Sequence, residues 1–225
     1  MLLAAVARPR HDPERDINVD GEIGIWPILE FLPAVRSSRN RPVGSLVPTL
    51  MNLDAAIYRK YVITRVIPAI KLKFPTATSA LYPSMTMQHP MVALPTLTLR
   101  GVSTDGWTFV VRCQPPNSPD LNVLDLGSFA SVQTLQLKLV SRSLGEVIHA
   151  TYAAFEICGG DALANVLLTL QTVMRLVLEN NGGNHYRLPH LGKDALRRAR
   201  ALMSNVSCPA SFLGKWPFRF LTNNT

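Results

Sequence analysis

Two carboxylates, Asp120 and Asp125, stand close together in the stretch QPPNSPDLNVLDLG, residues 114–127. Hard divalent cations prefer oxygen ligands, so two carboxylates at the start of a helix could help to hold Mg²⁺. Cleavage of a phosphodiester with two such ions needs acidic groups from several elements to converge on one place. The pair therefore predicts at most one part of a metal-dependent site.

The same stretch also carries the signals of a capped helix. Ser118 is a favoured N-cap residue, and Pro119 suits the first helical position. Asp120 would interact favourably with the positive end of the helix dipole. On this interpretation Asp120 is a helix-start residue, and Asp125, one turn later, is an exposed acid or an acid at the edge of the core. The residues alone leave both interpretations open, and the helix start is the simpler of the two.

Other reactive side chains do not form a set with recognisable spacing. The histidines lie in separate contexts, the cysteines have no C-x-x-C spacing, and Ser118 lacks the glycines of a nucleophile elbow. An odd number of cysteines fits a reducing compartment. The residues concerned are His89, His149, His185, His190, Cys113, Cys158 and Cys208.

Before the acidic stretch, the chain alternates between short apolar runs and basic segments. Residues 1–20 are charged and rich in turn formers, which predicts a poorly ordered leader. Residues 24–35 predict a strand cut by prolines, and residues 36–45 a basic loop or hairpin. Asp54 is a predicted N-cap of a basic amphipathic helix that is interrupted near Pro68.

Around and after the acidic stretch, the expected elements are mostly helical. A strand is possible at 84–88, and residues 105–113 predict a β-branched and aromatic strand. Helices are expected from Ser118 to about Lys138 and over 143–156, 161–180 and 195–203. Strands early and helices late indicate an α/β layer fold.

The charge of the chain favours polyanionic partners. Its 225 residues include 23 Lys and Arg against 15 Asp and Glu, a formal net charge of +8. Nucleic acid or an acidic membrane surface would suit this balance, although an ordinary basic protein has the same composition. No continuous apolar run reaches the roughly 18 to 20 residues of a membrane helix, and no secretory signal is evident. We therefore expect a soluble intracellular protein without a membrane partner.

The stretch QPPNSPDLNVLDLG resembles the segment that carries the third catalytic aspartate of mariner-like transposases. Within that motif Asp125 matches the catalytic acid and Asp120 does not. Further segments resemble the family in the same order. They are GEIGIWP (21–27), RSSRNRPVGS (36–45), YRKYVITRVIPAIKLKFP (58–75), DGWTFVVRC (105–113) and LLTLQTVMRLVLENNGGNHYRLPHLGK (167–193).

The resemblance implies an RNase H-like mixed sheet flanked by helices, with Mg²⁺ or Mn²⁺ on an aspartate triad and a role in cut-and-paste DNA transposition in the nucleus. This chain departs from the family at three points. We expect it to lack the family's N-terminal helix-turn-helix and a strand for the first aspartate, since Asp12, Asp16 and Asp20 are in the wrong setting. Where the second aspartate belongs, Gln88 and His89 fit but Pro90 follows.

The sequence therefore predicts a degenerate copy of such a catalytic core, incomplete at its N-terminus. We expect a leader at 1–20, an RNase H-like remnant at 21–203 and a tail at 204–225. Asp125 would be a vestigial metal ligand, with metal bound weakly or not at all, and DNA cleavage would be negligible. DNA would be bound largely without sequence preference, through six basic residues: Arg36, Arg39, Arg41, Arg59, Lys60 and Arg65.

Two further kinds of association follow from the same expectation. The chain could form a homo-oligomer or associate with a full-length transposase. The alternative function is a non-enzymatic interaction or oligomerisation protein, in which the helices of residues 143–203 provide the surface for the partner.

Overall fold

The computed structural model describes residues 1–12, 16–74, 101–104, 106, 107, 109, 115, 117–188, 190–209 and 211. These residues mix helices with strands, and the strands pair into three antiparallel two-stranded sheets. The broad α/β prediction is confirmed at this level. The RNase H-like sheet remains a hypothesis, because the described strands do not join into one mixed sheet.

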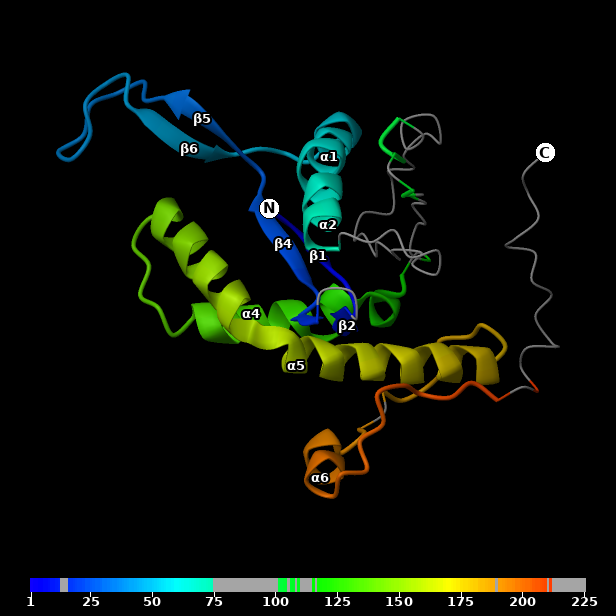
Figure 1. The fold of residues 1–225 in the computed structure, drawn as a ribbon. Coiled ribbons are helices and arrows are strands. Elements are labelled where there is room, and N and C mark those ends of the chain that lie inside the picture. The colour runs from blue at the N-terminus through cyan, green and yellow to red at the C-terminus, as the bar shows by residue number, and fades with distance from the viewer. Residues whose placement is uncertain are drawn as a thin grey trace.

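The central sheet pairs β1 (Leu2–Val6) with β4 (Glu22–Pro27). The side chains of β1 alternate between two cores, because successive residues of a strand point to opposite faces. Ala5 packs in the core formed with the α1–α2 helices, whereas Ala4 and Ile25 pack in the core formed with α4 and α5. The sheet is therefore covered by helices on both faces (Figure 1).

The prediction of a poorly ordered leader is wrong for the described part of residues 1–20. Besides β1, this part contains β2 (Arg10–Asp12) paired with β3 (Ile17–Val19). Ala4 and Ala5 are buried between the helical layers. The physical reason is that small apolar side chains fill a narrow space in the middle of the fold. An apolar run of only five residues does not by itself predict such burial.

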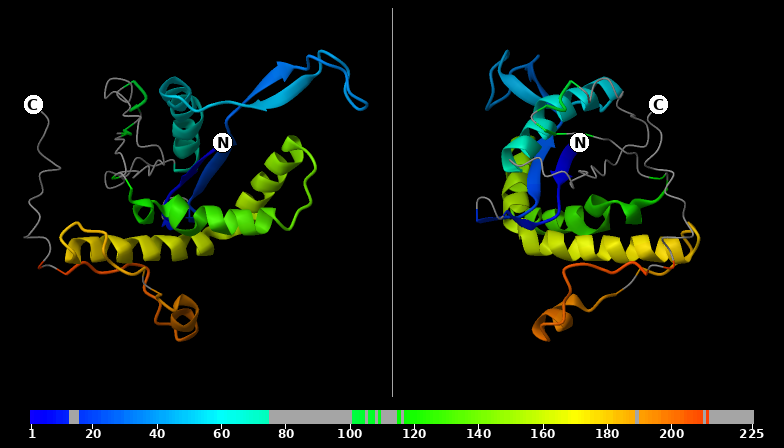
Figure 2. Two further views of the ribbon diagram at one scale, coloured as in Figure 1. Left: turned by 180° about the vertical axis from the view of Figure 1, so that it is seen from behind. Right: turned by 45° about the vertical axis from the view of Figure 1, so that its right-hand side comes forward.

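Strands β5 (Leu29–Pro33) and β6 (Leu46–Leu50) form a hairpin, and residues 36–45, predicted as a basic loop or hairpin, lie in the loop between them; strand β6 was not predicted. The loop between them is closed by hydrogen bonds, including Ala34 N–H to the Ser45 carbonyl at 2.8 Å. A further bridge pairs Ser38 with Arg41 near the tip. In all views the hairpin projects away from the helices and the central sheet (Figures 1 and 2).

One face of the central sheet is covered by α1 (Ala55–Tyr61), η1 (Val62–Val66) and α2 (Ile67–Lys73), which run on from one another. Asp54 caps this helix as predicted, its Oδ1 accepting the Ile57 N–H at 2.7 Å. The predicted interruption near Pro68 is confirmed, since η1 is a π-helical turn directly before α2. Proline has no N–H for the helical ladder, which favours such a local change of winding.

The other face is covered by η3 (Leu124–Ser128), α4 (Phe129–Gln136) and α5 (Leu144–Glu179). Ser143 caps α5, because its Oγ accepts the Glu146 N–H at 3.2 Å and the Glu146 carboxylate accepts the Arg142 N–H at 2.6 Å. The two helices predicted over 143–156 and 161–180 are the two halves of α5. They meet at Gly159, whose φ of 74° and ψ of 153° break the helical backbone.

The short helix α6 covers Lys193–Arg198, earlier than the predicted 195–203. It is anchored to α5, where the Lys193 ammonium donates to the Asn165 carbonyl at 2.5 Å and the Arg197 guanidinium donates to the Asn165 side chain at 3.0 Å. The strand expected at 84–88 lies outside the described residues. So does most of the strand expected at 105–113.

Helix α5 is long and apolar enough to cross a membrane by length and composition. The expectation that no segment reaches this length overlooked it, because polar residues divide its apolar positions. In the apolar window of α5 17% of the residues are buried, and α5 packs against α4, η3 and β4.

Candidate functional site

Asp125 lies in the first turn of η3, half-buried beside the start of α4. Its nearest partner is Asn122, whose Nδ2 donates to the Asp125 Oδ2 at 2.9 Å. The side chain of Asn122 is completely buried, with 0% of its surface exposed. The carboxylate that resembles a catalytic acid is thus held by a buried amide.

The helix does not begin at Ser118 as predicted. Residues Pro119–Leu121 form a single 3₁₀ turn, η2, and Asn122 then returns to an extended backbone with φ of −114° and ψ of 117°. The real cap is Asn122, because its Oδ1 accepts the Leu124 N–H at 3.0 Å. Asparagine is as good a cap as serine, and here it is the residue that precedes the continuous helix.

Asp120 is tied to a distant loop instead of acting at a long helix. Its carboxylate accepts a hydrogen bond from the Tyr186 hydroxyl, in the loop that follows α5. The pKa of Tyr186 is raised, first by burial and then by the nearby charge of Asp120. The contact joins the acidic stretch to the segment NHYRLPH.

The pKa of Asp125 is raised above its ordinary value. Burial is the main cause, since a low-dielectric surrounding disfavours the charged form, and the hydrogen bond from Asn122 acts in the opposite direction. A metal site with several acids would need a second carboxylate near this one. Asn122 supplies an amide in that position.

Asp125 is not joined by a set of further acids in the described part of the chain. Among the described residues, no three His, Cys, Asp or Glu side chains lie close enough together to hold a metal ion. The Asn122 oxygen, the other donor beside Asp125, is already used by the Leu124 N–H. Gln88, His89 and Pro90, where the family's second acid belongs, lie outside the described residues.

The sequence does not predict that two acids are more deeply buried than Asp125, namely Asp12 in β2, which is 6% exposed, and Glu22 at the start of β4. Only 7% of Glu22 is exposed, and its carboxylate accepts the N–H of Gly159 at the break in α5. Burial raises its pKa most, with further contributions from Asp20 and Glu156, while the Gly159 N–H and Lys73 act against the rise. A buried acid inside a strand has no sequence signature, because its partner is a backbone group exposed by a distant helix break.

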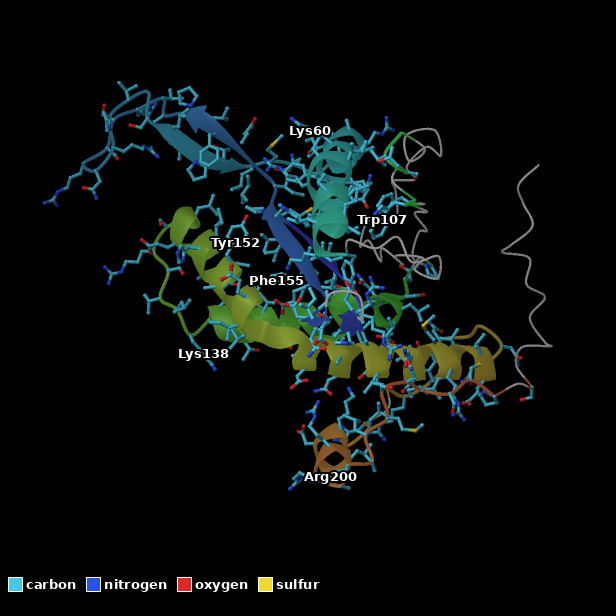
Figure 3. All side chains as sticks on the ribbon, viewed as in Figure 1. Lys60, Trp107, Lys138, Tyr152, Phe155 and Arg200 are labelled. Carbon is cyan, nitrogen blue, oxygen red and sulfur yellow. The ribbon has the colours of Figure 1, made fainter. Side chains whose placement is uncertain are left out.

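The six predicted DNA-binding residues fall into two groups. Arg36, Arg39 and Arg41 are exposed on the loop of the β5–β6 hairpin, which we call the hairpin tip. Arg59, Lys60 and Arg65 lie on α1 and η1, where Lys60 and Arg65 are exposed and Arg59 is half-buried. Lys60 projects from the upper part of this helix, away from α5 (Figure 3).

These basic side chains are not neutralised by the fold. Within the described residues, none of the six takes part in an ion pair or a side-chain hydrogen bond, and the ion pairs present are His11–Asp16, Arg175–Glu179 and Arg197–Asp194. Arg65 lies near Tyr152 of α5, whose pKa it lowers against the larger effect of burial. The charges remain available to a partner.

No family model, no curated protein and no solved structure matches the sequence. The resemblance to mariner-like transposases therefore remains a hypothesis that rests on the quoted segments.

Proposed function

We propose that the protein binds DNA largely without sequence preference, and that it derives from the RNase H-like catalytic domain of a mariner-like transposase whose cleavage activity has been lost. The observation that carries the proposal is the set of six basic side chains, five of them exposed and none paired with an acid among the described residues. Unpaired arginines and lysines neutralise phosphates and release counterions, which supplies most of non-specific DNA affinity.

The order of the resembling segments supports the ancestry, and the setting of Asp125 supports the loss of cleavage. Two metal ions would require several converging anionic ligands to offset the cost of dehydrating them. Asp125 has an amide beside it instead. On this proposal Mg²⁺ or Mn²⁺ is bound weakly or not at all, and the protein acts in the nucleus, where its DNA partner is found.

The binding half of the proposal is tested by titrating a short fluorescent duplex with the protein at increasing salt. We expect the logarithm of the association constant to fall linearly with the logarithm of the salt concentration, by about 0.9 for each phosphate contact. Duplexes of unrelated sequence should give the same slope. Salt-independent binding, or no binding at low salt, would contradict the proposal.

The cleavage half is tested separately, with supercoiled plasmid and Mn²⁺. We expect no nicking above the background of a buffer control. Metal-dependent nicking that is lost in Asp125→Ala would show that the acid still works, and the inactive half of the proposal would then be wrong while DNA binding could stand.

A non-enzymatic interaction protein is the second candidate, favoured by exposed apolar side chains. Phe31 is 62% exposed on the hairpin, and Ile157 is 69% exposed on α5. Surfaces of this kind often mark association sites. Size-exclusion chromatography with light scattering separates the two functions, because an oligomer that forms equally with and without DNA supports this candidate.

A further inference from the structure

The β5–β6 hairpin is the part of the molecule whose shape and chemistry the fold itself does not use. Its two strands pack chiefly against each other, and the hairpin projects from the body (Figures 1 and 2). An isolated two-stranded ribbon is only marginally stable in water, and it presents unpaired strand edges. The packing of the monomer therefore does not account for the ribbon, and its exposed surface is a candidate for contact with a partner.

The charge of the hairpin is one-sided. From Leu29 to Leu50 it contains three arginines and a single acid, Glu30. The arginines are gathered at the hairpin tip, while Glu30 lies within β5, away from the tip. The projecting end is therefore complementary to an anionic surface.

The tip is ordered by its own hydrogen bonds. The Gly44 N–H donates to the Ala34 carbonyl at 2.9 Å, and the Val43 N–H donates to the Ser37 Oγ at 3.2 Å. Arg36 and Arg41 are thus held on opposite arms of a closed loop, with Arg39 between them. A preorganised loop loses less conformational entropy when it binds than a flexible one does.

The dimensions of the ribbon distinguish between the grooves of duplex DNA. Neighbouring strands lie about 4.8 Å apart, and side chains on both faces bring a ribbon to roughly 10 Å in thickness. This fits the major groove, about 12 Å wide, and exceeds the minor groove, about 6 Å wide. An undistorted duplex therefore accepts the ribbon only in its major groove.

The apolar residues beside the tip agree with the major groove. Val35 is 89% exposed and Val43 is 61% exposed, one on each arm of the loop. Thymine methyl groups, the apolar features of DNA that such side chains can cover, occur only in the major groove. Phosphates at the rim of the groove are within the range of long arginine side chains.

We infer that the β5–β6 hairpin enters the major groove of duplex DNA, with Arg36, Arg39 and Arg41 on the phosphates and base edges and with Val35 and Val43 against the base edges. This inference rests on the proposed DNA-binding function and gives it a specific element and groove. Lys60 and Arg65 on the helix then add contacts outside the groove.

Matched variants test which element binds. The hairpin variant replaces Arg36, Arg39 and Arg41 with alanine. The charge control replaces Lys138, Arg187 and Arg198 with alanine, which removes the same number of charges from exposed positions elsewhere. We expect the hairpin variant to lose about 2 to 3 from the salt slope and to bind at least about tenfold more weakly, while the control keeps the slope of the unmodified protein. The helix variant, Lys60→Ala with Arg65→Ala, should lose less than the hairpin variant.

Methylation by dimethyl sulfate tests the groove, because it modifies guanine N7 in the major groove and adenine N3 in the minor groove. We expect the bound protein to slow methylation at guanine N7 but not at adenine N3, and the effect to disappear with the hairpin variant. Protection of adenine N3 alone would overturn the inference.

The remaining outcomes separate this inference from the proposed function. A hairpin variant that binds like the unmodified protein, with loss confined to the helix variant, overturns the inference and leaves DNA binding intact. No binding by the unmodified protein at low salt overturns both. A hairpin variant that changes the oligomeric state in light scattering, with an unchanged salt slope, shows a protein surface instead and also overturns the inference. Circular dichroism should show unchanged folding, since all substituted side chains are exposed.

Discussion

Replacement of Asn122 by alanine tests whether the acidic stretch is held together by one buried amide. Asn122 is fully buried, and its side chain makes two hydrogen bonds, from its Nδ2 to Asp125 and to its Oδ1 from the Leu124 N–H. Alanine removes both bonds and leaves the Leu124 N–H buried without a partner. The start of η3 should therefore become less stable, and the Asp125 side chain should lose its fixed orientation at the same time.

The expected loss follows from these two bonds. Removing a good N-cap costs about 1 kcal/mol of unfolding free energy. The hydrogen bond to a charged carboxylate adds about 1.5 to 3 kcal/mol when its partner is deleted, and the lower end applies because half-buried Asp125 regains water. The total is about 2.5 kcal/mol, which corresponds to a fall in Tm of roughly 5 to 10 °C for a chain of this length.

The assay is urea unfolding followed by circular dichroism, together with a thermal melt. Asn52→Ala is the control, because Asn52 is exposed and makes no side-chain hydrogen bond in the described part of the chain, so its loss should stay within about 0.5 kcal/mol. The exchanged pair, Asn122→Asp with Asp125→Asn, keeps an acceptor for the Leu124 N–H and reverses the donor between the two side chains. It should recover part of the loss, limited by the cost of placing the charge at the more buried position.

The reasoning would be refuted if Asn122→Ala were no less stable than Asn52→Ala. Equal losses for Asn122→Ala and the exchanged pair would show instead that shape, and not hydrogen bonding, matters at this position. Addition of Mg²⁺ should change none of these values, since among the described residues Asp125 has an amide beside it and no second carboxylate in a metal-binding group.

Two further substitutions, together with one control, test the break in α5. Glu22→Gln should raise stability at pH 7, because burial first, and Asp20 second, raise the folded-state pKa of Glu22 above its ordinary 4.5. The stability that this carboxyl group contributes is complete below pH 4.5 and is lost as the pH rises through the folded-state pKa, so the advantage of glutamine should vanish below pH 4.5. Urea unfolding at pH 7 and at pH 4 measures the difference in unfolding free energy between Glu22→Gln and the unmodified protein. A difference that favours glutamine less at pH 7 than at pH 4 would contradict the argument. Gly159→Ala should lower the free energy of unfolding by about 1 to 3 kcal/mol, because the φ of 74° at Gly159 is strained for any other residue. The control, Gly145→Ala, lies inside the regular first turn of α5 and should raise the free energy of unfolding by about 0.5 to 1 kcal/mol. Equal effects of the two variants in thermal melts would mean that α5 is not broken at Gly159.

Local signals predicted the elements that depend on local chemistry. Asp54 and Ser143 begin helices because the hydrogen bond of a cap is made within a few residues of the cap itself. The loop of the hairpin follows from Pro33 and the basic residues after it for the same reason, whereas strand β6 was not predicted.

Elements that depend on distant contacts were predicted poorly. Strand β1 is held by β4, about 20 residues further along, and by helices on both faces, so its five residues look unremarkable alone. From the sequence, the region of Gly159 separates two helices. The sequence does not show that the Gly159 N–H donates to Glu22, a distant contact at the point where the two halves of α5 meet. The burial of Glu22 could not be predicted for the same reason.

The acidic stretch shows how one wrong assignment bears on function. Given a cap at Ser118, Asp125 would lie within an established helix and its carboxylate would be free to act as a ligand. With the cap at Asn122, the same amide that starts the helix also donates to Asp125, so one side chain links the helix start to this carboxylate through two hydrogen bonds. A variant at Asp125 should therefore be detected first as a change in unfolding free energy. If Asp125→Ala changed metal-dependent DNA cleavage without changing stability, the carboxylate would be a working ligand and its contact with Asn122 incidental.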